Sequence, residues 1–450
     1  MKTLTLMSRW QCRFNRALAC FGISAFLLTG PSSATYAQLT DSGIHPPPTT
    51  GTYGYNTFKP GSAGFPAVGQ TYTDPVFGSV VKRLTDVTGR ANGDDIYAHH
   101  WSNADGTYAF NRSTGNVDIL MVATGQKVYT NQTWGLDGGD IFWDALDPDK
   151  YYYFSGTNLM RRNLAAQTST VMKTFPGTLQ SVGGSLNIQD RSGRYFTVRY
   201  SGTNKVWDSQ TNTIYAGSVT PVDSSGGWTT ISPDGNYLVD AASAANESYS
   251  YPINHTTQTI GPGTMFWNLC GDHGDVISAS DGKTYFITGN CNNIPAIYRV
   301  DVTQNEVGRT PAQVSADNQV LIPVTWTDAG HYSCVGKGTY QDWCFYSSES
   351  IIDGFDSSTA GWTAYKQEII AVNVLTLEVR RFAHHRSRGI TVAYSNSPRV
   401  SCSWDGSVVM WVSDYDVSSP TGYADLYTIQ SPLGSVQPPL PAPTNLRVIQ

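Results

Sequence analysis

Histidine and arginine side chains gather at three places along this chain of 450 residues. Histidine can transfer protons or bind metal ions near neutral pH, and arginine can hold a carboxylate through two parallel hydrogen bonds. Together these residue types indicate acid–base chemistry or metal binding directed at an acidic substrate. Five of the eight histidines and two arginines make up the three groups: His99 and His100, then His273, then His384, His385, Arg386 and Arg388.

A short turn follows the first two groups and recurs along the chain. It contains an adjacent Asp-Gly pair, or a close variant, and is followed by an apolar run rich in β-branched and aromatic residues. A self-similar unit of about 40–50 residues carrying about four strands is typical of one blade of a β-propeller. The turn markers are Asp105, Asp149, Gly193, Asp234, Asp281 and Asp405, and the first five are separated by 44, 44, 41 and 47 residues.

The number of blades and the closure of the ring can also be predicted. The step from Asp281 to Asp405 is 124 residues, which fits two blades and an insertion. We place the missing turn at 327–330 and the insertion at 349–363, which gives seven blades. A strand at 80–84 should close the ring beside 424–429, because closure leaves no exposed strand edge. The expected fold is all-β, a seven-bladed β-propeller over residues 74–430 whose N-terminal strand closes the last blade.

The two ends of the chain differ in composition from the repeats. Residues 1–37 have the form of a signal peptide, with a basic start, an apolar stretch at 17–28 and small residues before a cleavage site after Ala37. The alternative, an uncleaved membrane anchor, needs more than the 12 apolar residues present. Residues 38–73 form an extended lead-in rich in Pro, Gly and Thr, and residues 431–450 form a proline-rich tail. The expected mature protein is secreted, has no membrane span and is a monomer.

Charge, motifs and cysteines narrow the class of protein further. The net charge of -6, without a basic stripe, excludes nucleic acid as a partner. The chain lacks the motifs GxSxG, GxxxxGK(S/T), HExxH and GxGxxG, which excludes serine hydrolases, nucleotide-binding proteins and zinc proteases of those types. In an oxidising compartment Cys270–Cys291 and Cys334–Cys344 should form disulfides, and Cys402 is then left as a buried thiol.

Position relative to the repeated turn suggests where the candidate residues lie. Residues just before the first strand of a blade fall at one rim of the central channel, where distant parts of the chain converge. We expect His100, His273, His385 and Arg386 to act in catalysis there. The expected substrate contacts are His99, Trp101, His384, Arg388 and Arg399.

A structural explanation of the same residues is open. Strand alternation leaves at most one histidine of each adjacent pair facing the channel, so the other would lie between blades. A loop arginine is often solvated, and Trp101 suits core packing as well as stacking on a sugar ring.

The last third of the chain carries a resemblance to a known family. RRFAHHRSRGITVAYSNSPRVSCSWDGSVVMWVSDY resembles the closing blades of the oligogalacturonate lyases, and the adjacent Asp-Gly turns resemble Tol-type, WD-repeat-like propellers. The resemblance implies β-elimination: the C5 proton of a uronic acid is removed, its carboxylate charge is offset, and the bond at C4 breaks. It also implies a manganese ion held by histidines and a glutamine, with His273 as one ligand. The chain departs from that pattern at Arg399, where a second histidine ligand is expected.

Two functions and two cations follow from these observations. The first function is that of a secreted polysaccharide lyase acting on acidic polysaccharides or oligosaccharides, and the alternative is a non-catalytic propeller that binds glycans or proteins at a surface. The cofactor suggested is a divalent cation, manganese or calcium. Turn aspartates such as Asp144 and Asp147 would suit calcium, but they lack the glycine and glutamate of an EF-hand loop, and turn capping explains them.

Overall fold

The computed structural model describes most of one compact unit, which spans Tyr36–Gln450. The expected signal peptide, His99 and Cys270 lie outside the residues described, as do 435–450 of the tail. The residues described are 39–87, 100–113, 116–132, 141–183, 187–223, 227–242, 247–269, 273–291, 294–324, 330–348, 362–388, 396–417 and 423–434.

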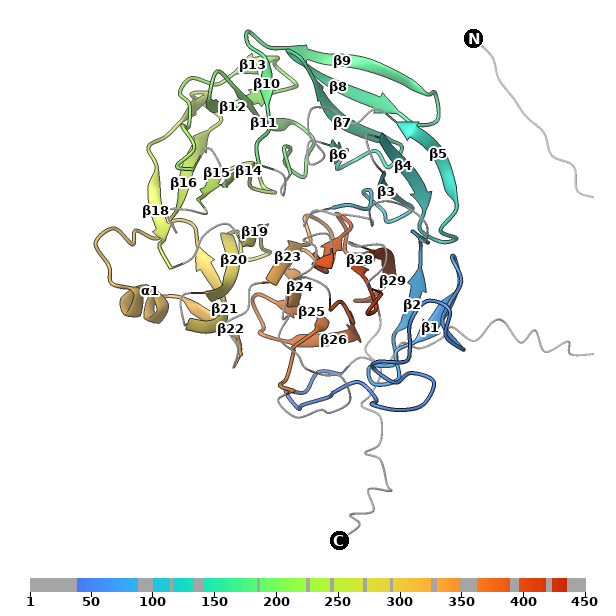
Figure 1. Ribbon diagram of the computed structural model, residues 1–450. Coiled ribbons are helices and arrows are strands. Elements are labelled where there is room, and N and C mark those ends of the chain that lie inside the picture. Colours follow the sequence, from blue (N-terminus) through green and yellow to red (C-terminus); the bar gives the residue numbers. More distant parts are fainter. Residues whose placement is uncertain are drawn as a thin grey trace, which may run out of the picture. The chain divides into compact units, whose positions relative to one another are not determined.

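Seven antiparallel sheets follow one another around a ring, as the repeat predicts (Figure 1). The first blade contains β3 (Tyr108–Ser113), β4 (Asn116–Met121) and β5 (Lys127–Gln132). The second contains β6 (Ile141–Trp143), β7 (Lys150–Ser155), β8 (Asn158–Asn163) and β9 (Thr168–Thr174). The third contains β10 (Leu179–Gln180), β11 (Tyr195–Tyr200), β12 (Thr203–Asp208) and β13 (Thr213–Ile214). The fourth contains β14 (Trp228–Ile231), β15 (Tyr237–Ala241), β16 (Ser248–Asn254), β17 (Thr259–Ile260) and β18 (Thr264–Trp267).

The last three blades carry most of the candidate residues. The fifth contains β19 (Gly274–Ser278), β20 (Thr284–Cys291), β21 (Ile294–Asp301), α1 (Pro311–Asp317) and β22 (Gln319–Pro323). The sixth contains β23 (Gly330–Cys334), β24 (Trp343–Ser348), β25 (Glu368–Asn373) and β26 (Val379–His384). The seventh contains β27 (Ser401–Cys402), β28 (Val408–Ser413), β29 (Asp425–Gln430), β2 (Val80–Arg83) and β1 (Thr71–Thr73).

The predicted closure of the ring is confirmed. Strand β2 pairs with β29, with Lys82 opposite Thr428 and Arg83 opposite Tyr427. The last residues of the lead-in add β1 as a fifth strand on the far side of β2. Arg83 also forms an ion pair of 2.7 Å with the fully buried Asp425, so the two ends of the propeller are joined by charge as well as by backbone hydrogen bonds.

The Asp-Gly turns join the first and second strands of their blades. In the turn between β14 and β15, the Asp234 carboxylate accepts hydrogen bonds from the Asn236 amide and the Ser232 hydroxyl. Gly235 has a φ of 78°, in the left-handed region that glycine adopts at little cost. This local chemistry explains why the turn could mark the blades.

The turn predicted at 327–330 for the sixth blade is wrong. Gly330 begins β23, which is the first strand of that blade, so its turn to β24 is the longer segment 335–342. An apolar run follows the segment 327–330 just as one follows each Asp-Gly turn, which explains the error. The run HYSCV is the first strand of its blade, whereas the runs after the Asp-Gly turns are second strands. The insertion expected at 349–363 lies almost entirely outside the residues described.

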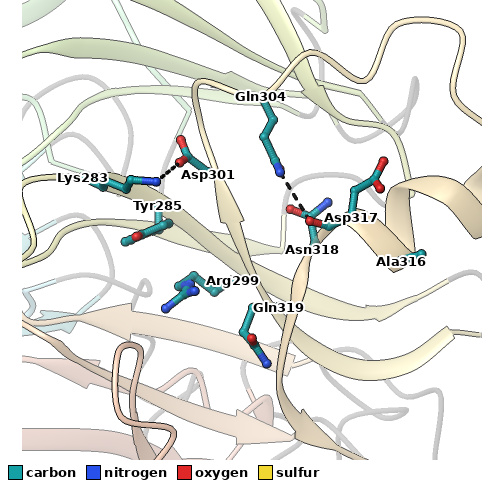
Figure 2. A pocket seen from close by; sticks show the side chains of 9 residues that line it. All are labelled: Lys283, Tyr285, Arg299, Asp301, Gln304, Ala316, Asp317, Asn318 and Gln319. Atoms are coloured by element: carbon teal, nitrogen blue, oxygen red, sulfur yellow. Dashed lines mark hydrogen bonds and ion pairs between the residues drawn. The ribbon is translucent and has the colours of Figure 1, made fainter.

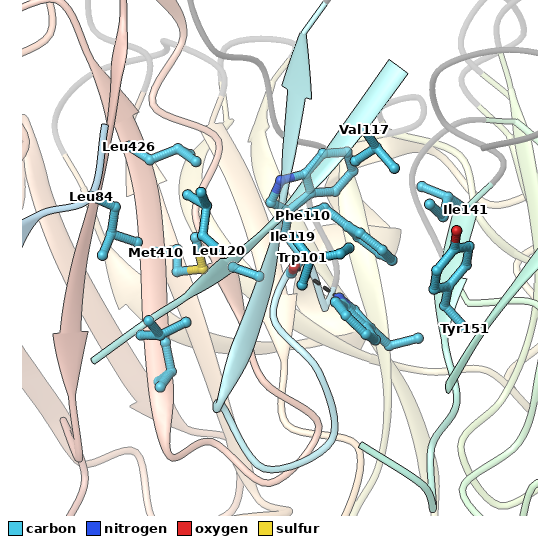
Figure 3. Close-up of a cluster of buried hydrophobic side chains, with 14 of the residues drawn as sticks. Leu84, Trp101, Phe110, Val117, Ile119, Leu120, Ile141, Tyr151, Met410 and Leu426 are labelled. Carbon is cyan, nitrogen blue, oxygen red and sulfur yellow. Dashed lines mark hydrogen bonds between the residues drawn. The ribbon is translucent and has the colours of Figure 1, made fainter. Parts of the chain in front are cut away.

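Aromatic and branched side chains fill the space between neighbouring blades. Figure 3 shows one such cluster, in which Phe110 of the first blade stacks on Trp143 of the second with ring centroids 4.2 Å apart. Trp101 lies in the same cluster at 3% exposure, and its carbonyl accepts a hydrogen bond from the Trp143 indole. Core packing therefore accounts for Trp101. Of the residues described, none belongs to a helix long and apolar enough to cross a membrane.

The cysteines agree with an oxidising compartment. Cys334 and Cys344 stand opposite each other in the β23–β24 ladder and form a disulfide, as predicted. Cys402 is a buried thiol, and burial raises its pKa, which disfavours the reactive thiolate. The Cys270–Cys291 disulfide stays a prediction because Cys270 lies outside the residues described.

Candidate functional site

The first strands of the fifth, sixth and seventh blades begin beside one another at one end of the propeller. We call this end the histidine rim and define it by three residues: His273, which directly precedes β19, His331, the second residue of β23, and Arg399, two residues before β27. Inner strands of adjacent blades run in the same direction, so residues that begin them lie at the same level.

His273 and His331 form a pair of imidazoles at this rim. Their ring centroids are 4.9 Å apart, and both rings are half-buried. The Nδ1 atom of His273 lies 3.1 Å from the Gly330 carbonyl oxygen. Because a carbonyl can only accept, Nδ1 carries the proton and Nε2 keeps a lone pair. The Nε2 atom of His273 can therefore accept a proton or ligate a cation.

A buried carboxyl group lies two residues beyond His273 on the same face of β19. Asp275 is 6% exposed and accepts hydrogen bonds from the backbone amides of Cys334 at 2.6 Å and Val276 at 2.7 Å. Burial raises its pKa to about 7 in spite of these two hydrogen bonds. Asp275 thus ties the fifth blade to the sixth and can hold a proton close to neutral pH.

Arg399 lies just before the inner strand of the seventh blade. The Cys402 amide donates to the Ser333 hydroxyl at 3.0 Å and the Val400 amide donates to the Ser347 hydroxyl at 3.1 Å, so the start of the seventh blade lies against the inner strands of the sixth. Arg399 is fully buried and has a φ of 39°. A left-handed backbone at a bulky residue costs on the order of 1 kcal/mol and is common at functional sites.

His100 lies in a different environment from His273. Its Nδ1 atom lies 3.0 Å from the Cys402 carbonyl oxygen, and its ring stacks on Trp404 with centroids 4.3 Å apart. Burial lowers its pKa to about 4, so the imidazole is neutral at pH 7. The contacts described for His100 and His273 involve different residues, and those of His100 bind the first blade to the seventh.

The third predicted group lies at the outer edge of the sixth blade. His384 ends β26, which is three strands out from β23, or about 14 Å at the usual strand spacing. Its Nε2 atom lies 2.8 Å from the His45 carbonyl oxygen of the lead-in. His385 is fully buried, and its Nδ1 accepts a hydrogen bond from the Ser387 amide.

Two arginines of this group also bind the lead-in. Arg386 is 1% exposed and donates to the Tyr53 carbonyl at 3.0 Å, and Arg388 donates to the Tyr55 carbonyl and the Asn56 side chain. A solvated loop, the structural alternative for these arginines, is therefore wrong for Arg386. Both arginines of this cluster therefore bind the lead-in.

The predicted three-histidine pocket is not seen among the contacts described. His100, His273 and His385 lie in three environments, so their catalytic roles stay predictions. Sequence reasoning missed His331 and Asp275. A glycine adjoins His273 in DHG and His331 in AGH, and this shared feature could have pointed to His331. Residues two apart on a strand share a face, so the position of Asp275 relative to His273 could have pointed to Asp275.

The fit of a divalent cation can be tested against the donor atoms present. Among the residues described, no group of three or more His, Cys, Asp or Glu could hold a metal ion. His273 and His331 supply at most two donors, which does not match the histidine and glutamine set that the resemblance implies. No chemical step proposed below uses a cation.

Comparisons with known proteins agree on the fold. No protein family model and no curated protein matches the sequence. An oligogalacturonate lyase in complex with manganese is similar in structure, with a TM-score of 0.51 and 15% identity over 80% of this chain and 96% of that chain. An oligogalacturonate lyase from Vibrio parahaemolyticus gives 0.49 and 12% over 81% and 98%, and TolB from Acinetobacter baumannii gives 0.33 and 12% over 64% and 63%. The match to the manganese complex confirms the predicted resemblance to the oligogalacturonate lyase propeller for the fold alone.

Proposed function

We propose that this protein is a secreted lyase that cleaves acidic polysaccharides or oligosaccharides by β-elimination at the histidine rim. The observation that carries the proposal is the pair of His273 and His331 at the start of two adjacent inner strands. The pair unites a basic nitrogen with a second imidazole, and Arg399 precedes the inner strand of the next blade. The resemblance to oligogalacturonate lyases supports the choice of a uronic-acid substrate.

The chemistry follows from the tautomer of His273. Its Nε2 atom accepts the C5 proton, and the electron pair of that C–H bond forms the C4–C5 double bond while the C4–O bond breaks. The leaving oxygen takes a proton from solvent. Because Arg399 is fully buried, its charge stabilises the negative charge that develops on the sugar from a distance and not by contact. His331 packs on the His273 ring and holds its orientation.

The proposed setting of this reaction is outside the cell. The expected signal peptide at 1–37 exports the chain, and the Cys334–Cys344 disulfide suits an oxidising compartment. The protein acts as a monomer in this proposal. Arg386 and Arg388 serve to hold the lead-in over the outer edge of the sixth blade.

An assay of the new double bond tests the proposal. The mature protein is incubated with pectic, ulvan-like and glycosaminoglycan polymers, with and without a chelator, and the absorbance of the 4,5-unsaturated product is followed. We expect His273→Gln to lower kcat by about 10²–10⁴, the usual contribution of a general base. His255→Gln is the matched control, because His255 is a half-buried histidine of the fourth blade that packs on Tyr195. Absence of product on every uronic-acid polymer would favour the non-catalytic glycan- or protein-binding alternative.

A further inference from the structure

A polar cavity of about 350 Å³ lies on the fifth blade (Figure 2), and its lining does not include the three residues of the histidine rim. Its walls come from the ends of β20 and β21 and from the segment that includes α1. Its lining includes Lys283, Tyr285, Arg299, Asp301, Ala316 and Asp317.

An insertion specific to this blade builds one wall of the cavity. The third and fourth strands, β21 and β22, are joined by residues 302–318, whereas the corresponding connections are 164–167 in the second blade and 374–378 in the sixth. The insertion is well ordered by its own sequence. Thr310 caps α1 through a reciprocal capping box with Gln313, and Val314 is buried against the blade.

The charges that line the cavity are paired, with one exception. Lys283 forms an ion pair with Asp301 at 3.1 Å, and Asp317 pairs with Arg309 outside the cavity. Arg299 has no acidic partner among the residues described. Its guanidinium lies 4.8 Å from the centre of the Tyr285 ring.

The Arg299 side chain is fixed by two contacts, and most of its N–H donors make no hydrogen bond to the residues described. Its Nη1 atom donates to the Val374 carbonyl of the sixth blade at 2.6 Å, which uses one of five N–H donors. The aromatic contact and this hydrogen bond fix the plane of the guanidinium. A fixed, uncompensated guanidinium at a polar cavity is suited to bind a carboxylate.

We propose that this cavity is a second, non-catalytic site for a carboxylate-bearing sugar, a uronic-acid unit of the polymer class cleaved at the histidine rim. Arg299 binds the carboxylate, and Asp301 and Asp317 accept hydrogen bonds from the hydroxyl groups. A largely polar lining favours a polyhydroxylated ligand over an apolar one. The identity of the sugar rests on the proposed function, but the carboxylate chemistry follows from Arg299 alone.

Binding of a galacturonic-acid trisaccharide to the full chain tests the site. Titration calorimetry is done in a His273→Gln background so that the probe is not consumed, and a neutral galactose trisaccharide serves as the ligand control. We expect Arg299→Gln to weaken binding of the acidic probe about tenfold or more, the loss typical of a charge-assisted hydrogen bond. Arg162→Gln, which removes an equal charge from the outer strands of the second blade, should leave the affinity unchanged.

A second variant guards against an effect on folding. Ala316→Trp fills the cavity from α1 and leaves Arg299 in the sequence, and it should also weaken binding while Tm stays near the wild-type value. Unchanged affinity in either Arg299→Gln or Ala316→Trp would overturn the inference, as would equal affinity for the neutral sugar.

The inference and the proposed function can fail separately. Arg299-dependent binding without any elimination product would remove the lyase proposal and keep the site. Elimination by the wild type without Arg299-dependent binding would remove the second site and keep the lyase proposal.

Discussion

His100 offers a direct test of whether a predicted catalytic histidine is instead a neutral structural group. In the folded protein burial lowers its pKa to about 4, whereas an unfolded histidine has a pKa near 6.5. Between these values the unfolded chain binds a proton that the folded chain does not, so stability falls as the pH falls. At about 1.4 kcal/mol per pKa unit, the loss is complete near pH 4 and amounts to about 3 kcal/mol.

The substitution His100→Asn removes this loss with little other change. Asparagine tolerates the φ of 36° at this position, and its amide can donate to the Cys402 carbonyl as the imidazole does. The free energy of unfolding is measured by urea titration at several pH values from 7.5 to 4, with His255→Asn as the matched control. We expect the wild type to lose about 3 kcal/mol more than His100→Asn over this range. Parallel curves would refute the assignment of His100 as a buried neutral group.

Three further predictions concern the sixth and seventh blades. Glu368→Gln should lower the free energy of unfolding by about 3–5 kcal/mol, because Arg381 is fully buried and pairs with both oxygens of Glu368 at 2.6 and 2.7 Å. Replacing both residues with Leu and Met should cost less than the sum of the single changes, and additive costs in a double-mutant cycle would contradict this. Loss of the Cys334–Cys344 disulfide should cost about 2–3 kcal/mol by urea unfolding. Mass spectrometry of the exported, unreduced protein should find Cys402 as its free thiol, and a free Cys334 would count against the pairing.

The blades could be predicted because their marker is local. An Asp-Gly turn needs only a capping carboxylate and a left-handed glycine, as at Asp234 and Gly235, and both are visible in a few residues of sequence. The sixth blade departs from this chemistry, since its turn is the longer segment 335–342. Because of that departure, the segment that begins the first strand was taken for the turn, and His331, the second residue of this strand, was missed.

The role of the arginines at the end of the sixth blade was harder to predict, because their contacts join residues far apart in the chain. Arg381 donates to the Gly43 carbonyl at 2.7 Å and Arg386 to the Tyr53 carbonyl, pairs separated by 338 and 333 residues. The repeat pattern of the sequence does not indicate that the lead-in folds back over the outer edge of the sixth blade. From the sequence, the run from His384 to Arg388 was therefore expected to face a binding pocket. In the structure Arg386 and Arg388 bind backbone carbonyls of the lead-in.

This use of the cations changes where an acidic substrate should be sought. A buried charge is costly unless it is compensated, and in the outer cluster His384 faces Asp74 while Arg381 is compensated by Glu368 and the lead-in. At the inner rim, the His273–His331 pair offers a basic nitrogen, and Arg399 precedes the neighbouring inner strand. The start of the inner strands of the fifth and sixth blades is therefore where we propose that a proton is taken from an acidic sugar, and the catalytic roles expected for His385 and Arg386 stay predictions.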